Sequence, residues 1–168
     1  KAAPHLAVTS GLTMRIVFIL FNANKNGPHE AIKDIRVRQA IAHAIDKETM
    51  ARELVGEGAR VIETICFPTQ FGCTDEGARR YPYDPEKAKA LLAEAGYKDG
   101  FDLEFFAYRE RPQAEAMVNY LRAVGIRANL NFMQYAAMRE LHRANKAAVT
   151  LQTWGSFSIN DVSAGPSA

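Results

Sequence analysis

The chain has 168 residues with 21 Lys and Arg against 19 Asp and Glu, so its net charge is +2, and 48% of its residues are hydrophobic. This composition is typical of one globular domain and excludes an intrinsically disordered chain, a collagen-like repeat and a disulfide-packed miniprotein. The near balance of charge argues against a nucleic-acid partner, because dedicated nucleic-acid-binding domains carry a marked basic excess.

Neither a membrane span nor an intact signal peptide is visible in the sequence. The longest apolar run covers residues 16–21, whereas a spanning helix needs about 20 apolar residues. Residues 1–10 lack a long apolar core and a convincing cleavage site. We therefore expect either a cytoplasmic protein or a mature or truncated form of an exported one.

The first half of the chain begins with a strand and continues with two helices. Residues 15–22 contain the continuous apolar run 16–21, which is rich in β-branched and aromatic side chains and predicts a strand buried on both faces. The spacing of apolar residues predicts a helix over 35–45, and Asp46 is placed to cap a second helix over 47–55. Residues 60–83 follow as a long irregular loop.

Both cysteines of the chain, Cys66 and Cys73, fall in this loop. They form either a short disulfide loop or a pair of buried thiols, and the sequence leaves both readings open. Two cysteines without nearby histidines do not make a zinc site, so no metal is predicted here.

The second half alternates between helices and strands. It opens with the strongest local signal in the chain, Asp84-Pro85-Glu86, in which Asp84 is the N-cap and Pro85 fits the first helical turn. The elements that we expect are helices over 85–95, 113–124 and 135–144, and strands over 101–108, 126–133 and 148–154.

This alternation predicts an α/β fold with a mostly parallel sheet flanked by helices. In such sheets ligands bind at the carboxyl ends of the strands. Those ends lie near Asn22, at Tyr108-Arg109, at Gln134 and at Trp154-Gly155-Ser156. Trp154 is the only tryptophan, and it either stacks on a ligand or closes the core.

Signatures of known enzyme classes are absent from the sequence. It contains no G-x-S-x-G elbow, no Walker A loop and no H-E-x-x-H pair, and its four histidines are far apart. We therefore expect no catalytic residues, no metal site and no cofactor.

Two long segments carry a family resemblance, and they are residues 34–47 (DIRVRQAIAHAIDK) and 83–97 (YDPEKAKALLAEAGY). With Phe21-Asn22 upstream and residues 120–126 and Trp154-Gly155 downstream, their order and spacing resemble family 5 of the extracytoplasmic solute-binding proteins, which serve peptide and nickel ABC importers.

The resemblance implies a type II clamshell of two lobes, of which this chain is part of one. It divides the chain into an N-terminal segment over 1–14, the solute-binding lobe over 15–156 and a C-terminal segment over 157–168 that leads toward the other lobe. It further implies a periplasmic monomer that captures a peptide-like or other small solute and delivers it to a membrane permease.

The resemblance also singles out candidate contacts. Trp154 is expected to stack on apolar groups, Ser156 and Asn22 to make polar contacts and Asp161 to pair with a charge. Peptide-binding relatives often place an aspartate three residues after the tryptophan, and here that position is Phe157. Loss of that carboxylate puts the dipeptide-like mode in doubt, because a buried ammonium without a partner is costly. In an exported protein, a Cys66–Cys73 disulfide becomes the favoured pairing.

Two other classes compete with the importer hypothesis. One is a sensor or chemoreceptor domain with the same fold. The other is an enzyme with a site at the carboxyl ends of the strands, which requires titratable groups that converge on a pocket near Trp154.

Overall fold

A computed structural model describes residues 13–56 and 58–155. The elements in chain order are β1 Arg15–Phe21, α1 Glu30–Lys33, α2 Ile35–Ala44, α3 Lys47–Met50, the π-helical turn η1 Ala51–Val55, α4 Pro85–Glu94, β2 Phe101–Ala107, α5 Arg111–Ala123, β3 Ile126–Phe132, α6 Tyr135–Arg143 and β4 Val149–Gly155. Within the described ranges, no helix is long and apolar enough to cross a membrane.

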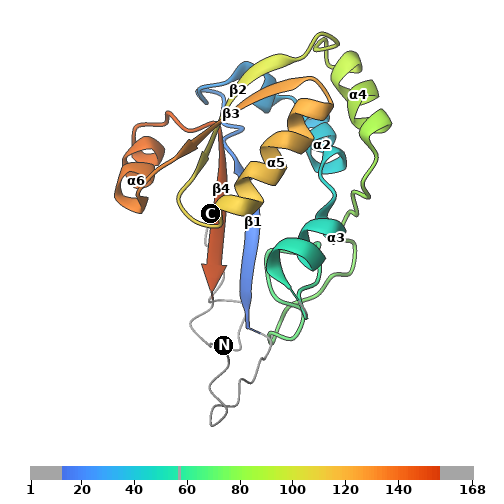
Figure 1. Cartoon of the computed structure of the whole chain (residues 1–168), viewed down its shortest axis with the longest axis vertical. Coiled ribbons are helices and arrows are strands. Elements are labelled where there is room, and N and C mark those ends of the chain that lie inside the picture. The colour runs from blue at the N-terminus through green and yellow to red at the C-terminus, as the bar shows by residue number, and fades with distance from the viewer. Residues whose placement is uncertain (1–12, 57, 156–168) are drawn as a thin grey trace, which may run out of the picture.

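The four strands form one sheet in the order β1-β4-β2-β3 (Figure 1). Strands β3 and β4 both run parallel to β2, whereas β1 is antiparallel to β4. The prediction of a mostly parallel α/β sheet flanked by helices is confirmed. The exception, β1, occupies an edge.

The handedness of the connections places helices on both faces of the sheet. Helix α5 connects β2 to its neighbour β3 at the edge of the sheet. Helix α6 then connects β3 to β4, which lies on the other side of β2. Since crossovers between parallel strands are almost always right-handed, two such connections in opposite directions put α5 and α6 on opposite faces. Figure 1 shows α6 on one side of the sheet and α5, with α2 and α4, on the other.

The main core lies between the sheet and α2, α4 and α5. Strand β2 shows why it forms, because Phe101, Leu103, Phe105 and Ala107 are buried while the alternate residues are more exposed. The largest side chains with almost no exposure include Phe105, Ile41, Leu92, Leu103, Leu121, Ile126 and Leu151. The core therefore holds the strands whose carboxyl ends carry the candidate site.

Strand β1 departs from the expectation of a strand buried on both faces. Val17 is 37% exposed and Leu20 is 46% exposed, and only Ile16 of the strand is buried. The prediction was wrong because a continuous apolar run is typical of a central strand, whereas β1 pairs with β4 alone.

The helix starts follow the capping residues that the sequence predicts. The Asp46 carboxylate accepts a hydrogen bond from the backbone N–H of Thr49 at 3.0 Å, and that of Asp84 accepts one from Lys87 at 2.9 Å. The helix expected over 47–55 is α3 continued as a π-helical turn. Helix α5 begins at Arg111, earlier than expected, because Pro112 is tolerated in a first turn.

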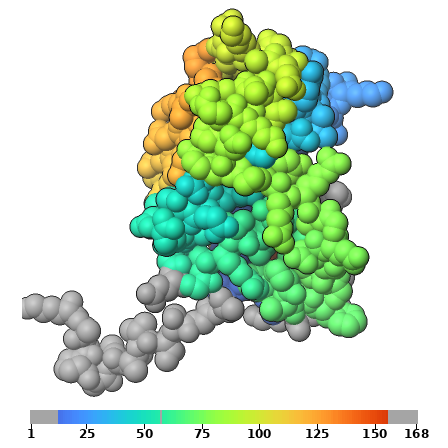
Figure 2. Space-filling model, turned by 90° about the vertical axis from the view of Figure 1, so that its right-hand side faces the viewer, coloured from blue at the N-terminus to red at the C-terminus, as the bar shows by residue number. Residues whose placement is uncertain are grey.

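The long loop that follows η1 lies against the molecule rather than projecting from it. Figure 2 shows this loop, in green, beside the teal of α3 and η1 and below α4. Cys66, Phe67 and Gln70 are buried in it. A stretch without regular structure is thereby part of the packed surface.

Candidate functional site

The carboxyl ends of the three parallel strands bring together aromatic and basic side chains. Tyr108 and Arg109 directly follow β2, Tyr135 opens α6 after β3, and Thr153 and Trp154 lie at the end of β4. We call these five residues the carboxyl-end cluster. They come from three separate segments, and the parallel course of the strands is what places them at one end of the sheet.

Contacts within the carboxyl-end cluster centre on Tyr108. Its ring centroid lies 4.9 Å from that of Tyr135, and its hydroxyl lies 3.4 Å from Oγ1 of Thr153. The guanidinium of Arg109 lies 5.9 Å from the Tyr108 ring. Tyr135 is 54% exposed, so an aromatic face remains open to a ligand.

With Arg139, whose guanidinium lies 5.9 Å from the centre of the Tyr135 ring, Arg109 gives this end of the sheet its charge. It is exposed and makes no ion pair with any residue in the described ranges. After it, Glu110 takes a left-handed backbone conformation with φ of 54°, and α5 starts at the next residue. An unpaired guanidinium beside open aromatic rings can bind a carboxylate next to an apolar group.

The structure separates two residues that the sequence analysis placed together. Trp154 is partly buried and lies opposite Ile16, at the start of β1, whereas Asn22 follows the far end of that strand and bonds to Ala148. Six residues of strand put them about 20 Å apart. The expectation that Asn22 shares an end with Trp154 was wrong because β1 runs antiparallel to β4.

Ser156, Phe157 and Asp161 lie outside the described residues. Sequence reasoning located the strand end at Tyr108-Arg109 but singled out neither residue as a ligand contact, and it missed Tyr135. The available signal was their position directly after a strand or at the start of the following helix.

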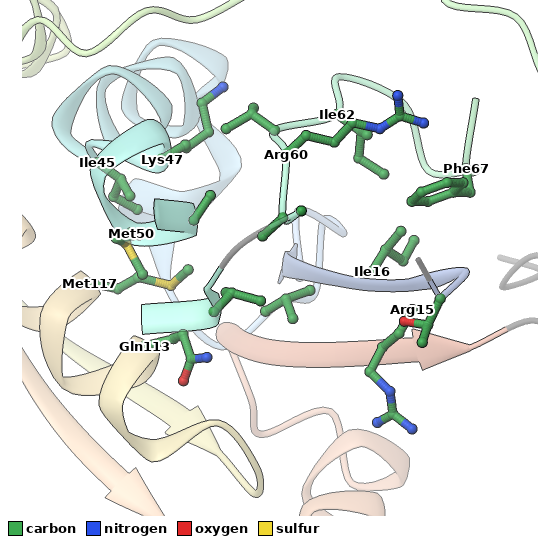
Figure 3. A pocket seen from close by; sticks show the side chains of 17 residues that line it. Arg15, Ile16, Ile45, Lys47, Met50, Arg60, Ile62, Phe67, Gln113 and Met117 are labelled. Carbon is green, nitrogen blue, oxygen red and sulfur yellow. The ribbon is translucent and has the colours of Figure 1, made fainter. Parts of the chain in front are cut away.

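A cavity lies between β1, α3, η1, the start of α5 and the long loop, and its lining residue Ile16 pairs with Trp154. The volume of this cavity is about 600 Å³. Figure 3 shows Ile16, Met50, Phe67, Gln113 and Met117 around it, contributed by four separate segments. Tyr108, Tyr135 and Trp154 do not line it.

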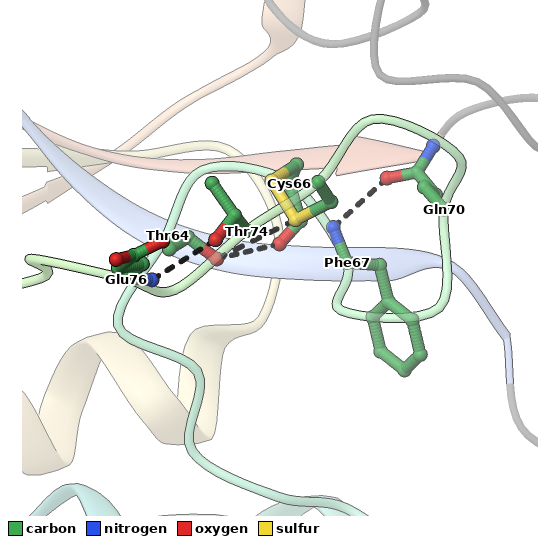
Figure 4. Close-up of a disulfide and its surroundings, with 7 residues drawn as sticks. Thr64, Cys66, Phe67, Gln70, Thr74 and Glu76 are labelled. Atoms are coloured by element: carbon green, nitrogen blue, oxygen red, sulfur yellow. Dashed lines mark hydrogen bonds between the residues drawn. A yellow bond between two sulfur atoms is a disulfide. The ribbon is translucent and has the colours of Figure 1, made fainter.

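A disulfide between Cys66 and Cys73 closes the loop that walls this cavity, with a Cα–Cα distance of 5.9 Å (Figure 4). Hydrogen bonds hold the same loop: the backbone N–H of Phe67 donates to Oε1 of Gln70 at 2.8 Å, and the Thr64 hydroxyl donates to the Cys66 carbonyl at 2.9 Å. The bridge thus fixes a buried segment of the wall.

Metal ligands do not gather in the part of the chain that the structure describes, where His, Cys, Asp and Glu nowhere form a group of three or more able to hold a metal ion. The pKa of the Asp102 carboxyl is lowered by its hydrogen bond to Arg127, but this exposed pair lies at the end of the sheet away from the carboxyl-end cluster.

Comparison with known sequences gives a profile match that covers residues 1–166, to bacterial extracellular solute-binding proteins, family 5 Middle. Heme-binding protein A of Haemophilus influenzae is 31% identical over 163 residues, which is 92% of this chain and 28% of that protein. The dipeptide-binding protein of Escherichia coli is 32% identical over 126 residues, 70% of this chain and 22% of that protein.

Solved structures give a consistent result. HbpA2 from Haemophilus parasuis superposes with a TM-score of 0.80 at 25% identity, and covers 91% of this chain and 31% of that one. A dipeptide-binding protein from Pseudoalteromonas, in complex with Met-Leu, gives a TM-score of 0.73 at 27% identity over 85% of this chain and 29% of that one. The chain therefore spans less than a third of the length of these relatives.

Proposed function

Because the chain belongs to family 5 of the bacterial extracellular solute-binding proteins, we propose that it forms part of one lobe of the substrate-binding protein of an ABC importer. The solute that we propose is a short peptide. In this proposal the complete protein is exported to the periplasm, encloses the peptide between two lobes and delivers it to a membrane permease.

The observation that carries the peptide proposal is the carboxyl-end cluster. Arg109 offers an unpaired cation to a peptide carboxylate, while Tyr108 and Tyr135 offer aromatic faces to an apolar side chain. Relatives described as binding dipeptides in Escherichia coli and di- or tripeptides in Pseudomonas aeruginosa add support. Trp154, Ser156 and Asp161 remain candidate contacts in this proposal.

The proposed mechanism is binding without chemistry. A peptide on the carboxyl-end cluster would be covered by the second lobe, and exclusion of water would strengthen the interaction of its carboxylate with Arg109. The peptide shifts the protein toward the closed state only by its higher affinity for that state. Contacts to the second lobe must therefore form when it closes.

Isothermal titration calorimetry on the whole gene product with a dipeptide library tests the proposal. We expect Arg109→Gln to weaken binding by about tenfold or more, because a charge-assisted hydrogen bond is lost. Arg127→Gln is the matched control, since Arg127 lies at the other end of the sheet in an exposed pair with Asp102. Absence of binding to any peptide, or equal losses in the two variants, would refute the proposal.

A further inference from the structure

Each ring of the tyrosine pair in the carboxyl-end cluster has a guanidinium beside it. That of Arg109 lies 5.9 Å from the centre of the Tyr108 ring, and that of Arg139 lies 5.9 Å from the centre of the Tyr135 ring. The centres of the two rings are 4.9 Å apart. Arg139 follows Tyr135 by four residues in α6, so both side chains lie on one face of that helix. A ligand that packs on the tyrosines therefore meets two cations.

Neither of these cations is neutralised in the part of the chain that the structure describes. Arg109 and Arg139 are both exposed, and no carboxylate in the described ranges forms an ion pair with either of them. Glu110 directly follows Arg109 but forms no ion pair within these ranges, and Glu140, which follows Arg139, is paired with Arg143 at 2.6 Å. Both guanidinium groups are thus available to the carboxylates of a ligand.

Arg15 adds a third positive charge at this end of the sheet. It lies opposite Gly155 at the start of β1, is exposed and forms no ion pair with any described residue. In the proposed function a second lobe covers this end and excludes water. Burial of cations without counter-charges is costly, so a ligand that brings negative charge is favoured. A peptide with neutral side chains has no net charge, because its ammonium offsets its carboxylate, whereas one acidic side chain makes it an anion.

We propose that the carboxyl-end cluster selects short peptides that contain an acidic side chain. The C-terminal carboxylate binds Arg109, as in the proposed function on which this inference rests. The acidic side chain binds Arg139, and an apolar side chain packs on the open face of Tyr135. A guanidinium forms two parallel hydrogen bonds with a carboxylate, whereas an amide of the same shape offers one acceptor and no charge. Arg139 thus determines specificity, and Arg109 serves every peptide.

Calorimetry on the whole gene product with matched peptides tests this selectivity. The members of each pair differ only in a carboxylate and its amide: Ala-Glu-Phe against Ala-Gln-Phe, and Phe-Glu against Phe-Gln. We expect the acidic member to bind about tenfold more tightly in at least one pair. This ratio of affinities should fall to about one in Arg139→Gln. Arg109→Gln should weaken both members and keep the ratio, because both have the same C-terminal carboxylate.

Two control variants separate a specific contact from the general effect of charge. Arg143→Gln removes a paired cation from the same helix and should leave both affinities unchanged. Arg15→Gln removes the exposed cation of β1 and should lower the ratio less than Arg139→Gln does.

Three results would overturn the selectivity and leave the peptide function intact. They are equal affinities within both pairs, binding of neutral peptides alone, and a ratio that Arg15→Gln reduces as much as Arg139→Gln does. Absence of binding to every peptide in the library would instead refute the proposed function, and this inference with it.

Discussion

The side chains of Asn22 and Asn145 are hydrogen-bonded to each other although 123 residues separate them. Nδ2 of Asn22 donates to Oδ1 of Asn145 at 2.6 Å, and Nδ2 of Asn145 donates in turn to the backbone carbonyl of Asn26 at 2.6 Å. Asn145 has a φ of 54°, a left-handed conformation that asparagine tolerates better than most residues. The pair joins the end of β1 to the turn before β4.

This relationship gives Asn145 a structural role that substitutions can measure. We expect Asn145→Ala to lower the free energy of unfolding by about 3 kcal/mol, since two hydrogen bonds are lost and alanine is strained at positive φ. Asn145→Gly loses the same bonds without the strain and should cost about 2 kcal/mol. Urea unfolding measures both, and equal losses would show that backbone strain does not contribute.

Asn22 itself was predicted from the sequence to contact the solute, and its place in the fold argues for a different result. We expect Asn22→Ala to lower the free energy of unfolding by about 1 kcal/mol, the net value of one hydrogen bond, and to leave peptide affinity unchanged. Calorimetry with the best peptide ligand measures the affinity. A loss of binding similar to that of Arg109→Gln would restore Asn22 as a solute contact.

The disulfide supports a loop that contains no regular structure. It closes a loop with a sequence separation of 7 between Cys66 and Cys73. The chain-entropy relation gives about 2.5 kcal/mol for so short a loop, so Cys66→Ser with Cys73→Ser should lower the free energy of unfolding by about that amount. Reduction with dithiothreitol should destabilise the wild type equally and leave the double variant unchanged. A reductant effect on that variant would contradict the assignment.

Local signals in the sequence were sufficient to find most of the fold. Asp84 and Pro85 define the start of α4, and the alternating burial of β2 and β3 follows directly from the polar and apolar residues. The orientation of β1 could not be derived in the same way. An apolar run has no direction, and whether it lies in the centre or at an edge depends on which strands pair with it.

The candidate site, like the fold, was predicted from the sequence only in part. The rule that ligands bind at the carboxyl ends of parallel strands pointed to Tyr108 and Trp154, but it misplaced Asn22 because it assumed that β1 runs the same way as β4. The cavity that Gln113 and Met117 line had no sequence signal at all. It forms between a loop without periodicity, β1, α3 and the start of α5, an arrangement that depends on tertiary structure alone.

The N-cap of α3 makes the free energy of unfolding depend on pH in the acidic range. The hydrogen bond from the Thr49 backbone N–H lowers the pKa of the Asp46 carboxyl, so the stability that its ionised form contributes is present above the unfolded pKa of about 3.9 and is lost as the pH falls through the folded value. We expect Asp46→Asn, which caps without titrating, to lose less stability than the wild type between about pH 5 and pH 2.

Urea unfolding over that pH range measures the difference, with Asp46→Ala as the control. That variant loses the cap at every pH, so it should be about 1 kcal/mol less stable than the wild type at pH 7 and should share the flatter acid dependence of Asp46→Asn. If the free energy of unfolding falls in parallel for all three proteins on acidification, Asp46 does not contribute to the loss of stability at low pH.

The turn before β2 depends on two glycines that lie a few residues apart and differ in their surroundings. Both have positive φ, 88° at Gly96 and 72° at Gly100. A Cβ on Gly96 would meet nothing within 4 Å, whereas one on Gly100 would lie 1.8 Å from the backbone oxygen of Gly125, which precedes β3. Gly100 therefore permits the close approach of the chain segments that lead into β2 and β3.

Alanine at each glycine separates backbone strain from this steric conflict. Gly96→Ala should cost about 1–2 kcal/mol, the value of an alanine in the left-handed region. Gly100→Ala adds a clash with backbone that no side-chain movement can relieve, so it should cost roughly 4 kcal/mol or more and displace the start of β2 from β3. Urea unfolding gives the energies, and hydrogen exchange at Phe101 and Ile126 reports the strand pairing. Equal costs at the two positions would mean that the segments can separate without loss.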